Sequence, residues 1–340
     1  MPWKLLQTRT YLFGFVLIVG LGAVSYLVLG RGINSSVAEQ QLHREQVFAR
    51  AEASNISSFF QAFGDSVALR ARLSSMERMD ATTAQDLDVF VEQWRDRELI
   101  GGIVLADKYG DVRFNSNILG APDLGASLAD RDYFAWAKNE TREEGEYYVG
   151  RPVVSRLGAS EGDTIVPVAS PVYQNTTFVG VVVASVRLGP LTKNYLELMQ
   201  VSDLTDVYLI DQEGEMLYSN SFPDAIGLNI FEYLKENPFS GSQTLGNDLK
   251  NALNTMGEGK LKTSYSDPRT GKMEVHSMSY TPILLGSQNW LLVGASPIED
   301  VGSFATPIYV RLTILLLLII LTIFLFGVIS VRKDQTQKKV

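Results

Sequence analysis

The chain has 340 residues, a formal net charge of −8, no cysteine and only two histidines, His43 and His276. No disulfide can form without cysteine. An acidic chain lacks the positive field that attracts nucleic acid, so we expect no nucleic-acid partner. With two histidines and no cysteine, the chain offers few ligands for a zinc centre and few bases that could activate a nucleophile. We therefore expect no enzymatic activity, no metal and no cofactor.

Two long stretches without charge lie near the ends, Tyr11–Gly30 and Leu312–Val331. Because about 20 apolar residues are enough for a helix to cross a bilayer, the sequence predicts transmembrane helices at 11–30 and 308–331. Positive flanks stay in the cytoplasm, so both ends, 1–10 and 332–340, are predicted to be cytoplasmic. The flanking charges are Lys4, Arg9, Arg332, Lys333, Lys338 and Lys339, which outnumber Arg31 and Arg311 on the inner sides.

The region between the two stretches would then lie outside the cytoplasm. An acidic, cysteine-free outer region is typical of the bacterial periplasm, so we expect a two-pass protein of the bacterial inner membrane. A cleaved signal peptide is the alternative for the first stretch, with Ala23-Val24-Ser25 as a cleavage site. The second stretch would still anchor the chain in that case.

Residues 34–75 contain no proline and a single glycine, Gly64, and are predicted to form one long helix. The second half of this helix places apolar residues at helical spacing, which requires a partner surface. The first half is polar and is expected to be poorly buried, so we predict that it pairs with a second copy in a homodimer. The apolar stripe consists of Ile56, Phe59, Phe60, Phe63 and Val67.

After a shorter helix at 84–98, the pattern changes to strands. Residues 100–116 indicate a hairpin with a turn at Asp107–Asp111, and two more strands follow at 164–173 and 178–188. The same order then recurs. Asp211–Tyr218 repeats Asp107–Phe114 at an offset of 104 residues (211 minus 107). We predict an α+β fold with two tandem modules, 76–190 and 191–303, each with an antiparallel sheet.

The segment Asp130–Ala137 is the most distinctive of the chain. It sets Arg131 among Tyr133, Phe134 and Trp136, and Tyr147, Tyr148 and Arg151 follow shortly after. Arginine offers a planar fork of donors that matches a carboxylate, and aromatic walls suit a small-molecule pocket. The alternative is a helix start capped by Asp130 or Asp132 with the aromatics in the core.

The long helix, the repeated hairpin, the Arg-Asp-Tyr-Phe segment and the strand pair with Ser-Pro-Val resemble the double Cache (PDC-type) sensor family over about 37–298. Members are extracytoplasmic ligand-binding domains of bacterial chemoreceptors, sensor kinases and diguanylate cyclases, built from PAS-like modules. The resemblance implies a pocket in the first, membrane-distal module. It implies that Arg131 holds a ligand carboxylate, that Tyr133 and Phe134 are aromatic pocket residues, and that Tyr147 or Tyr148 lines the opposite wall. The full candidate set is Arg131, Tyr133, Phe134, Trp136, Tyr147, Tyr148, Arg151, Asp163 and Ser185, with Arg156 and Thr164 left open.

Two departures from the family bear on the ligand. Members that bind amino acids have a tyrosine five residues before the arginine and an aspartate near the end of the last distal strand. Ala126 and Ser185 take those places here. An α-ammonium group would lack its counter-charge, so we expect a small carboxylate without an amine.

These features predict a receptor that senses a small periplasmic ligand and passes the signal through dimeric helices to a cytoplasmic or membrane partner. After Val331 only nine residues follow, so the output is expected outside this chain. The chain is then either a complete protein with a separate partner or the input half of a longer histidine kinase, diguanylate cyclase or chemoreceptor. A membrane-anchored structural or assembly protein without a ligand is the alternative of another class.

Overall fold

The structure is a computed structural model. It describes the chain except residues 1, 96–97, 121–124, 201–203, 268, 299–309 and 326–340, and except the side chains of 2–19, 21–22, 25–38 and 41. Two compact units are present. One consists of residues 1–43 and 297–340, and the other is residues 44–296.

The first unit holds the two stretches that were predicted to span a membrane. The helix α1 (Pro2–Ala71) runs through 11–30 without a break, and residues 310–325 are also helical. Among the described residues no helix is both long enough and apolar enough to cross a membrane. Most side chains of 11–30, and residues 326–331, lie outside the described part. The two predicted spans are therefore not confirmed.

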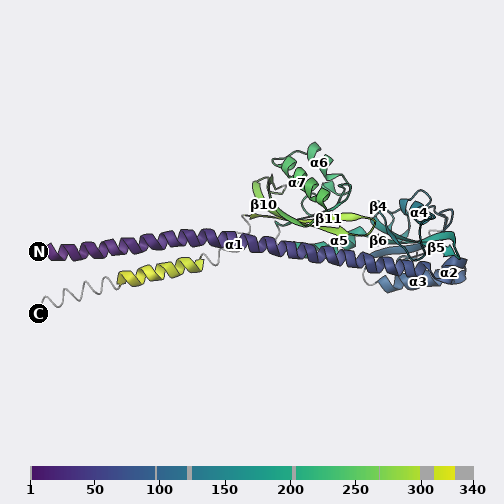
Figure 1. Cartoon of the computed structure of the whole chain (residues 1–340), viewed down its shortest axis with the longest axis horizontal. Coiled ribbons are helices and arrows are strands. Elements are labelled where there is room, and N and C mark those ends of the chain that lie inside the picture. Colours follow the sequence, from purple (N-terminus) through teal and green to yellow (C-terminus); the bar gives the residue numbers. More distant parts are fainter. Residues whose placement is uncertain are drawn as a thin grey trace. The chain divides into compact units, whose positions relative to one another are not determined.

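The second unit contains two modules of the same design (Figure 1). In the first module the strand order is β2-β1-β6-β5-β3, with β4 paired to β5, and every recorded pairing is antiparallel. The elements of this module are α2 (Ser74–Arg78), α3 (Ala81–Trp94), β1 (Ile100–Asp107), β2 (Val112–Asn117), α4 (Asp132–Ala137), β3 (Tyr148–Val149), β4 (Val153–Val154), the 3-10 helix η2 (Gly158–Ser160), β5 (Thr164–Gln174) and β6 (Thr177–Arg187).

The second module repeats this order as β8-β7-β11-β10-β9. Its hairpin β7–β8 and its strands β10 and β11 correspond to β1–β2, β5 and β6 of the first module. The predicted α+β fold, with a long N-terminal helix and two antiparallel sheets, is thus confirmed. The elements are α5 (Leu188–Leu196), η3 (Glu197–Met199), β7 (Asp206–Asp211), β8 (Met216–Ser219), η4 (Pro223–Ala225), α6 (Ile230–Glu236), α7 (Ser242–Thr255), β9 (Gly259–Ser266), β10 (Met273–Leu284) and β11 (Asn289–Pro297).

Helix α1 supplies the core that the two sheets share. The predicted apolar stripe from Ile56 to Val67 is buried in one cluster with residues of β1, β6, β7 and β11. The Phe60 ring meets Trp290 of the second module edge-on, with ring centroids 5.6 Å apart, and Phe63 meets Trp94 of α3 in the same way at 5.0 Å. Both modules therefore pack against one continuous helix.

The polar part of α1 is less exposed than expected. Glu45 and Gln46 are buried, and the side-chain amide of Gln46 donates a hydrogen bond of 3.0 Å to the Thr281 hydroxyl of β10. The expectation of poor burial is wrong at these two residues, because the second module reaches down this part of the helix. Helical periodicity alone does not show that a polar face can be covered by a polar strand.

The two hairpin turns share one design but differ in charge. Asp107 accepts hydrogen bonds from the backbone N–H groups at 109 and 111, and Asp211 accepts them from those at 213 and 215. Burial tends to raise the pKa of both carboxyls. At Asp107 the hydrogen bond from Arg113, at 2.7 Å, and the two N–H groups outweigh burial and lower the pKa. Leu217 takes the place of that arginine in the second turn. Burial, together with two neighbouring glutamates, there raises the pKa of Asp211 to about 6.

The two aspartates should therefore respond to pH in opposite ways. Between pH 3.8 and about 6 the folded protein keeps a proton on Asp211 that the unfolded chain has lost. Its contribution to the free energy of unfolding then falls as pH rises through this window. The contribution of Asp107 is present above pH 3.8 and is lost as pH falls below it. We expect the unfolding temperature of Asp211→Asn, relative to wild type, to rise between pH 4 and 6.

The matched variant is Asp107→Asn, whose unfolding temperature relative to wild type should instead fall as pH rises from about 3 towards neutrality. Thermal denaturation followed by circular dichroism at several pH values measures both. The same sign for the two variants would contradict the assignment of these charges.

Candidate ligand-binding site

A cavity of about 240 Å³ lies in the first module, on the face of the sheet that points away from α1. Strand alternation explains the placement. Ile103 and Leu105 of β1 point into the core with α1, and Val104 between them points into the cavity. The wall opposite the sheet comes from the segments at 126–133 and 153–160. The lining residues are Gly101, Gly102, Ile103, Val104, Ser116, Asn117, Ala126, Ser127, Leu128, Arg131, Tyr133, Val153, Ser155, Arg156, Leu157, Gly158, Ala159, Ser160, Ile165, Pro167, Val183 and Ser185.

Two glycines at the start of β1 make room for the polar side of the cavity. A Cβ atom on Gly101 would stand 1.8 Å from the Ser160 hydroxyl oxygen and 2.9 Å from that of Ser185. On Gly102 it would stand 2.7 Å from the Cβ of Asn117. Glycine inside a strand commonly marks such a close approach. Gly101 therefore makes room for the two hydroxyls, and Gly102 makes room for Asn117 on the neighbouring strand.

Arg131 is positioned by the start of α4. Its carbonyl oxygen accepts backbone hydrogen bonds from residues 134 and 135, at 3.1 Å each, so the first turn of the helix fixes its backbone. The side chain lines the cavity. Its Nε is buried and has no hydrogen-bond partner within the described part of the chain. A buried guanidinium donor without a partner is uncommon and points to a group that is recognised there.

Tyr133 lies two residues further on and also lines the cavity. Burial raises the pKa of its phenol to about 12, and the positive charge of Arg131 only partly offsets this effect. The phenol is therefore neutral at ordinary pH and can donate a hydrogen bond. Ser160 adds a buried hydroxyl with no partner among the described residues, and Ser185 donates to the carbonyl oxygen of Gly102 at 3.3 Å.

The charge of the cavity is one-sided. Two arginines, Arg131 and Arg156, line it, and none of its described lining residues is acidic. Arg156 is exposed and makes an ion pair of 2.8 Å with Asp130, so its charge is largely compensated. The charge of Arg131 has no recorded ion pair within the described residues. This electrostatic balance favours an anion.

Three of the nine residues singled out from the sequence line the cavity: Arg131, Tyr133 and Ser185. The geometry of α4 explains why its other aromatics do not. Successive residues of a helix differ by about 100°, so Phe134 turns into the core against Phe178. Trp136 stacks on Tyr148, with ring centroids 5.2 Å apart.

The remaining three lie elsewhere. Tyr147 packs on α1, where Gly64 leaves space for its ring: a Cβ at that position would stand 2.3 Å from it. Arg151 makes an ion pair of 2.8 Å with Glu213 of the second module. Asp163 makes one of 3.0 Å with Arg187. A ligand role for Phe134, Trp136, Tyr147, Tyr148, Arg151 and Asp163 stays a prediction that the cavity geometry does not support.

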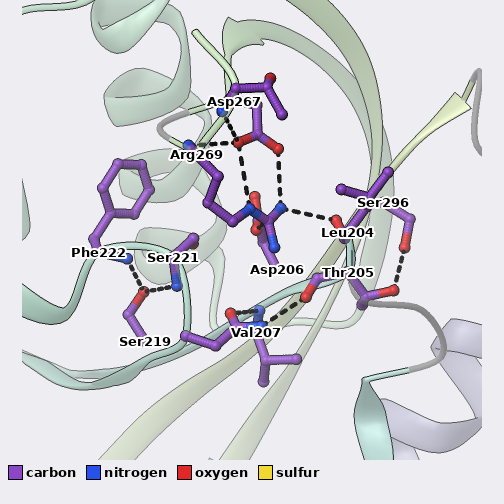
Figure 2. A network of polar contacts seen from close by, with 12 residues as sticks. Leu204, Thr205, Asp206, Val207, Ser219, Ser221, Phe222, Asp267, Arg269 and Ser296 are labelled. Carbon is purple, nitrogen blue, oxygen red and sulfur yellow. Dashed lines mark hydrogen bonds and ion pairs between the residues drawn. The ribbon is translucent and has the colours of Figure 1, made fainter. Parts of the chain in front are cut away.

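In the second module the corresponding place is filled by side chains of the protein. The strand registers make Asp206 and Tyr208 the counterparts of Gly102 and Val104, because Val104 pairs with Val183 and Tyr208 pairs with Val293 on equivalent strands. Figure 2 shows the Asp206 carboxylate beside Arg269, whose Nη2 donates to it at 2.8 Å.

The hydroxyls of Tyr208 and Tyr265 donate to the other oxygen of Asp206, at 3.0 and 2.7 Å. Burial raises the pKa of Asp206 and opposes these favourable contacts. The second module thus holds a carboxylate of its own on an arginine and two phenols. The first module has an open cavity with an arginine and one phenol at the corresponding place.

Comparisons with known proteins agree with this architecture. A family model for the Cache domain (dCache_1) matches residues 32–303. A search of curated proteins found no matching relative. Among solved structures, one similar to this chain is an extracellular ligand-binding receptor from Desulfohalobium retbaense DSM5692, at 13% identity and a TM-score of 0.54. That match covers 73% of this chain and 39% of the receptor, so this chain spans well under half of its length.

Two further structures are matched over nearly their whole length. The ligand-binding domain of the Pseudomonas fluorescens chemoreceptor CtaA in complex with L-serine is 17% identical, with a TM-score of 0.54, and the match covers 77% of this chain and 99% of that one. A methyl-accepting chemotaxis protein X is 16% identical, with a TM-score of 0.56 and coverage of 77% and 99%. At such identities the likeness shows the fold alone. The family match over both modules shows more, and the chain belongs to the Cache domain family.

Proposed function

We propose that the chain is the sensor part of a membrane-anchored receptor and that its first module binds a small carboxylate without an amino group. The observation that carries this proposal is the buried, unpartnered Nε of Arg131 in a cavity with no acidic residue among its described lining. A carboxylate offers two acceptor oxygens that match a guanidinium fork. The cavity volume of about 240 Å³ lies below the roughly 300–1,000 Å³ typical of larger ligands, which favours a small acid.

None of the described residues that line the cavity is acidic, and this bears on the class of ligand. A zwitterionic amino acid brings an ammonium group whose desolvation must be offset by a counter-charge. Asp163, the acidic candidate from the sequence, is held by Arg187 outside the cavity, and Ser185 supplies only a hydroxyl. The CtaA domain was solved with L-serine, so an amino acid is the competing ligand class for this fold.

The path from the cavity to the proposed membrane anchor follows two elements. Strand β1 forms one wall of the cavity with Val104 and packs on α1 with Ile103 and Leu105. Helix α1 continues from this contact to Pro2 through the uncharged stretch 11–30. A ligand can shift this system only if it binds two arrangements of the module with different affinity. We propose that a shift of β1 moves α1 within a homodimer and reaches a separate output.

Calorimetric titration of the purified full chain tests the ligand class. Propionate, lactate and pyruvate serve as carboxylates without an amine, and L-alanine and L-serine are the matched amino acids. We expect at least one of the three acids to bind about tenfold more tightly than its amino-acid analogue, since an uncompensated ammonium costs more than about 1.4 kcal/mol. Binding of the amino acids alone would contradict the proposal. Binding of neither class would favour a structural protein that has no ligand.

A further inference from the structure

The hairpin β9–β10 of the second module brings three metal-ligand side chains together, outside the cavity described above. Oxygens of Asp267 and Glu274 and a ring nitrogen of His276 all lie within 4.8 Å of one another. Glu274 and His276 are two residues apart on β10, so they point to the same side of the sheet. Asp267 directly follows β9 at the turn of the hairpin.

His276 is the member of this group that calls for an explanation. Its ring is fully buried, and both ring nitrogens lack a hydrogen-bond partner among the described residues. The neutral imidazole has one donor and one acceptor, and a buried side chain that satisfies neither usually marks an ion or a water. Thr263, directly opposite on β9, also has a buried hydroxyl without a recorded partner. Each of the two paired strands, β9 and β10, thus carries a buried polar side chain that has no hydrogen-bond partner among the described residues.

The ring of His276 is held in place by its neighbours. It stacks on Tyr265, with centroids 3.9 Å apart and an angle of 12° between the planes. The hydroxyl of Tyr265 in turn donates a hydrogen bond to Asp206, so the ring on which His276 stacks is itself held in place.

The carboxylate of Asp267 is fixed by hydrogen bonds to both of its oxygens, as metal-binding carboxylates usually are. The backbone N–H groups of Arg269 and Thr270 donate to its Oδ1 at 2.7 and 3.2 Å. Nη2 of Arg269 donates to its Oδ2 at 2.9 Å. Figure 2 shows the guanidinium of Arg269 in contact with both Asp267 and Asp206. Glu274 is half-buried and has no recorded side-chain hydrogen bond or ion pair within the described residues, so it is free to turn towards a metal.

The local charge also favours a cation. Three carboxyl groups, those of Asp206, Asp267 and Glu274, face one guanidinium and a neutral imidazole. Burial raises the pKa of Asp206, but even with Asp206 protonated the two remaining carboxylates outnumber Arg269. A divalent cation would reverse that imbalance.

We propose that Asp267, Glu274 and His276 bind one divalent transition-metal ion, with zinc as the best match to two carboxylate oxygens and one imidazole nitrogen. Imidazole is a poor ligand for the hard cations magnesium and calcium. Zinc is commonly held by three protein ligands and a water. Thr263, whose buried hydroxyl has no partner among the described residues, pairs with His276 on the neighbouring strand. The expectation of no metal rested on the two distant histidines, whereas the hairpin places two carboxylates beside the ring of His276.

The test is calorimetric titration of zinc chloride into the full chain after treatment with a chelator. The chain offers a matched pair of variants, because it contains only two histidines. His276→Phe keeps a flat ring that can stack on Tyr265 and removes both nitrogens, and His43→Phe makes the same change on α1. We expect one zinc ion to bind wild type and His43→Phe, with binding to His276→Phe weaker by at least about tenfold.

A second variant tests the site even if His276→Phe fails to fold. Glu274→Gln alters a half-buried side chain, so the unfolding temperature without zinc should stay unchanged while zinc affinity falls by about tenfold. The zinc-dependent rise in the unfolding temperature should be smaller in this variant than in wild type. Equal zinc binding by wild type, His276→Phe and Glu274→Gln would overturn the site. So would the absence of stoichiometric binding in wild type.

Discussion

Replacing Arg131 with alanine is expected to weaken binding of a small carboxylate by about tenfold to a hundredfold, since a hydrogen bond to a charged group contributes about 1.5–3 kcal/mol. The reason is specific to this side chain. Its Nε is a buried, charged donor in the cavity that no described residue satisfies, and no acidic residue among the described lining competes for its charge. Calorimetric titration of the variant with the acid that binds wild type most tightly measures the loss.

Arg151→Ala is the matched control for this experiment. The sequence places both arginines in the same aromatic-rich region, but Arg151 makes an ion pair with Glu213 and does not line the cavity. An exposed pair of this kind contributes roughly 0–1 kcal/mol, so both affinity and stability should stay close to wild type. Equal weakening of binding by both variants would mean that Arg131 has no special role.

Replacing Asp206 with alanine should be strongly destabilising. The change removes the acceptor that two buried phenols, Tyr208 and Tyr265, share, and because these hydroxyls lie 3.3 Å apart only one of them can still donate to the other. It also removes one of the two carboxylates that face Arg269. Buried groups left unpaired cost about 1–3 kcal/mol each, and breaking a buried charge pair costs about 3–5 kcal/mol. Because the ion pair between Arg269 and Asp267 remains, we expect the free energy of unfolding to fall by about 3 kcal/mol, near the lower end of the range for a broken buried charge pair. Urea denaturation followed by circular dichroism measures it.

The matched control is Asp163→Ala, which removes the carboxylate of an ion pair with Arg187 at the surface of the first module. That pair has the same chemistry and a similar length, but the Asp163 side chain is 48% exposed whereas that of Asp206 is fully buried. Its loss should cost less than about 1 kcal/mol. Similar costs for Asp163→Ala and Asp206→Ala would show that the buried network contributes nothing beyond an ordinary surface pair.

The fold was largely predictable because the features that specify it are local in the sequence. The spacing of Phe59, Phe60 and Phe63 is helical, and the Asp-x-x-Gly turns at 107 and 211 recur with the same flanking strands. Such patterns can be recognised in the sequence without knowing which surface the element packs against. Burial of Glu45 and Gln46 was not predictable, since it depends on a strand more than 200 residues away, β10, reaching the helix.

The site was predictable only in part. Arg131 and Tyr133 stood out because a charge among aromatics is unusual. Gly101 and Ser160 did not, because their role comes from a close approach between a strand and a distant loop. The pair of glycines at the start of β1 was the one available signal, since glycine weakens a strand unless space is needed there. Conversely, Tyr147 has the chemistry of a pocket wall, yet it fills the space left by Gly64 on α1.

The central claim, that the first module holds a carboxylate on Arg131, is tested most directly by a crystal structure of the chain with the acid that calorimetry selects. We predict that the ligand lies in the cavity of the first module, with a carboxylate oxygen about 2.7–2.9 Å from Nε of Arg131. The phenol of Tyr133 should face the same group. A ligand bound in the second module, or one in the first module with its carboxylate directed away from Arg131, would contradict the account.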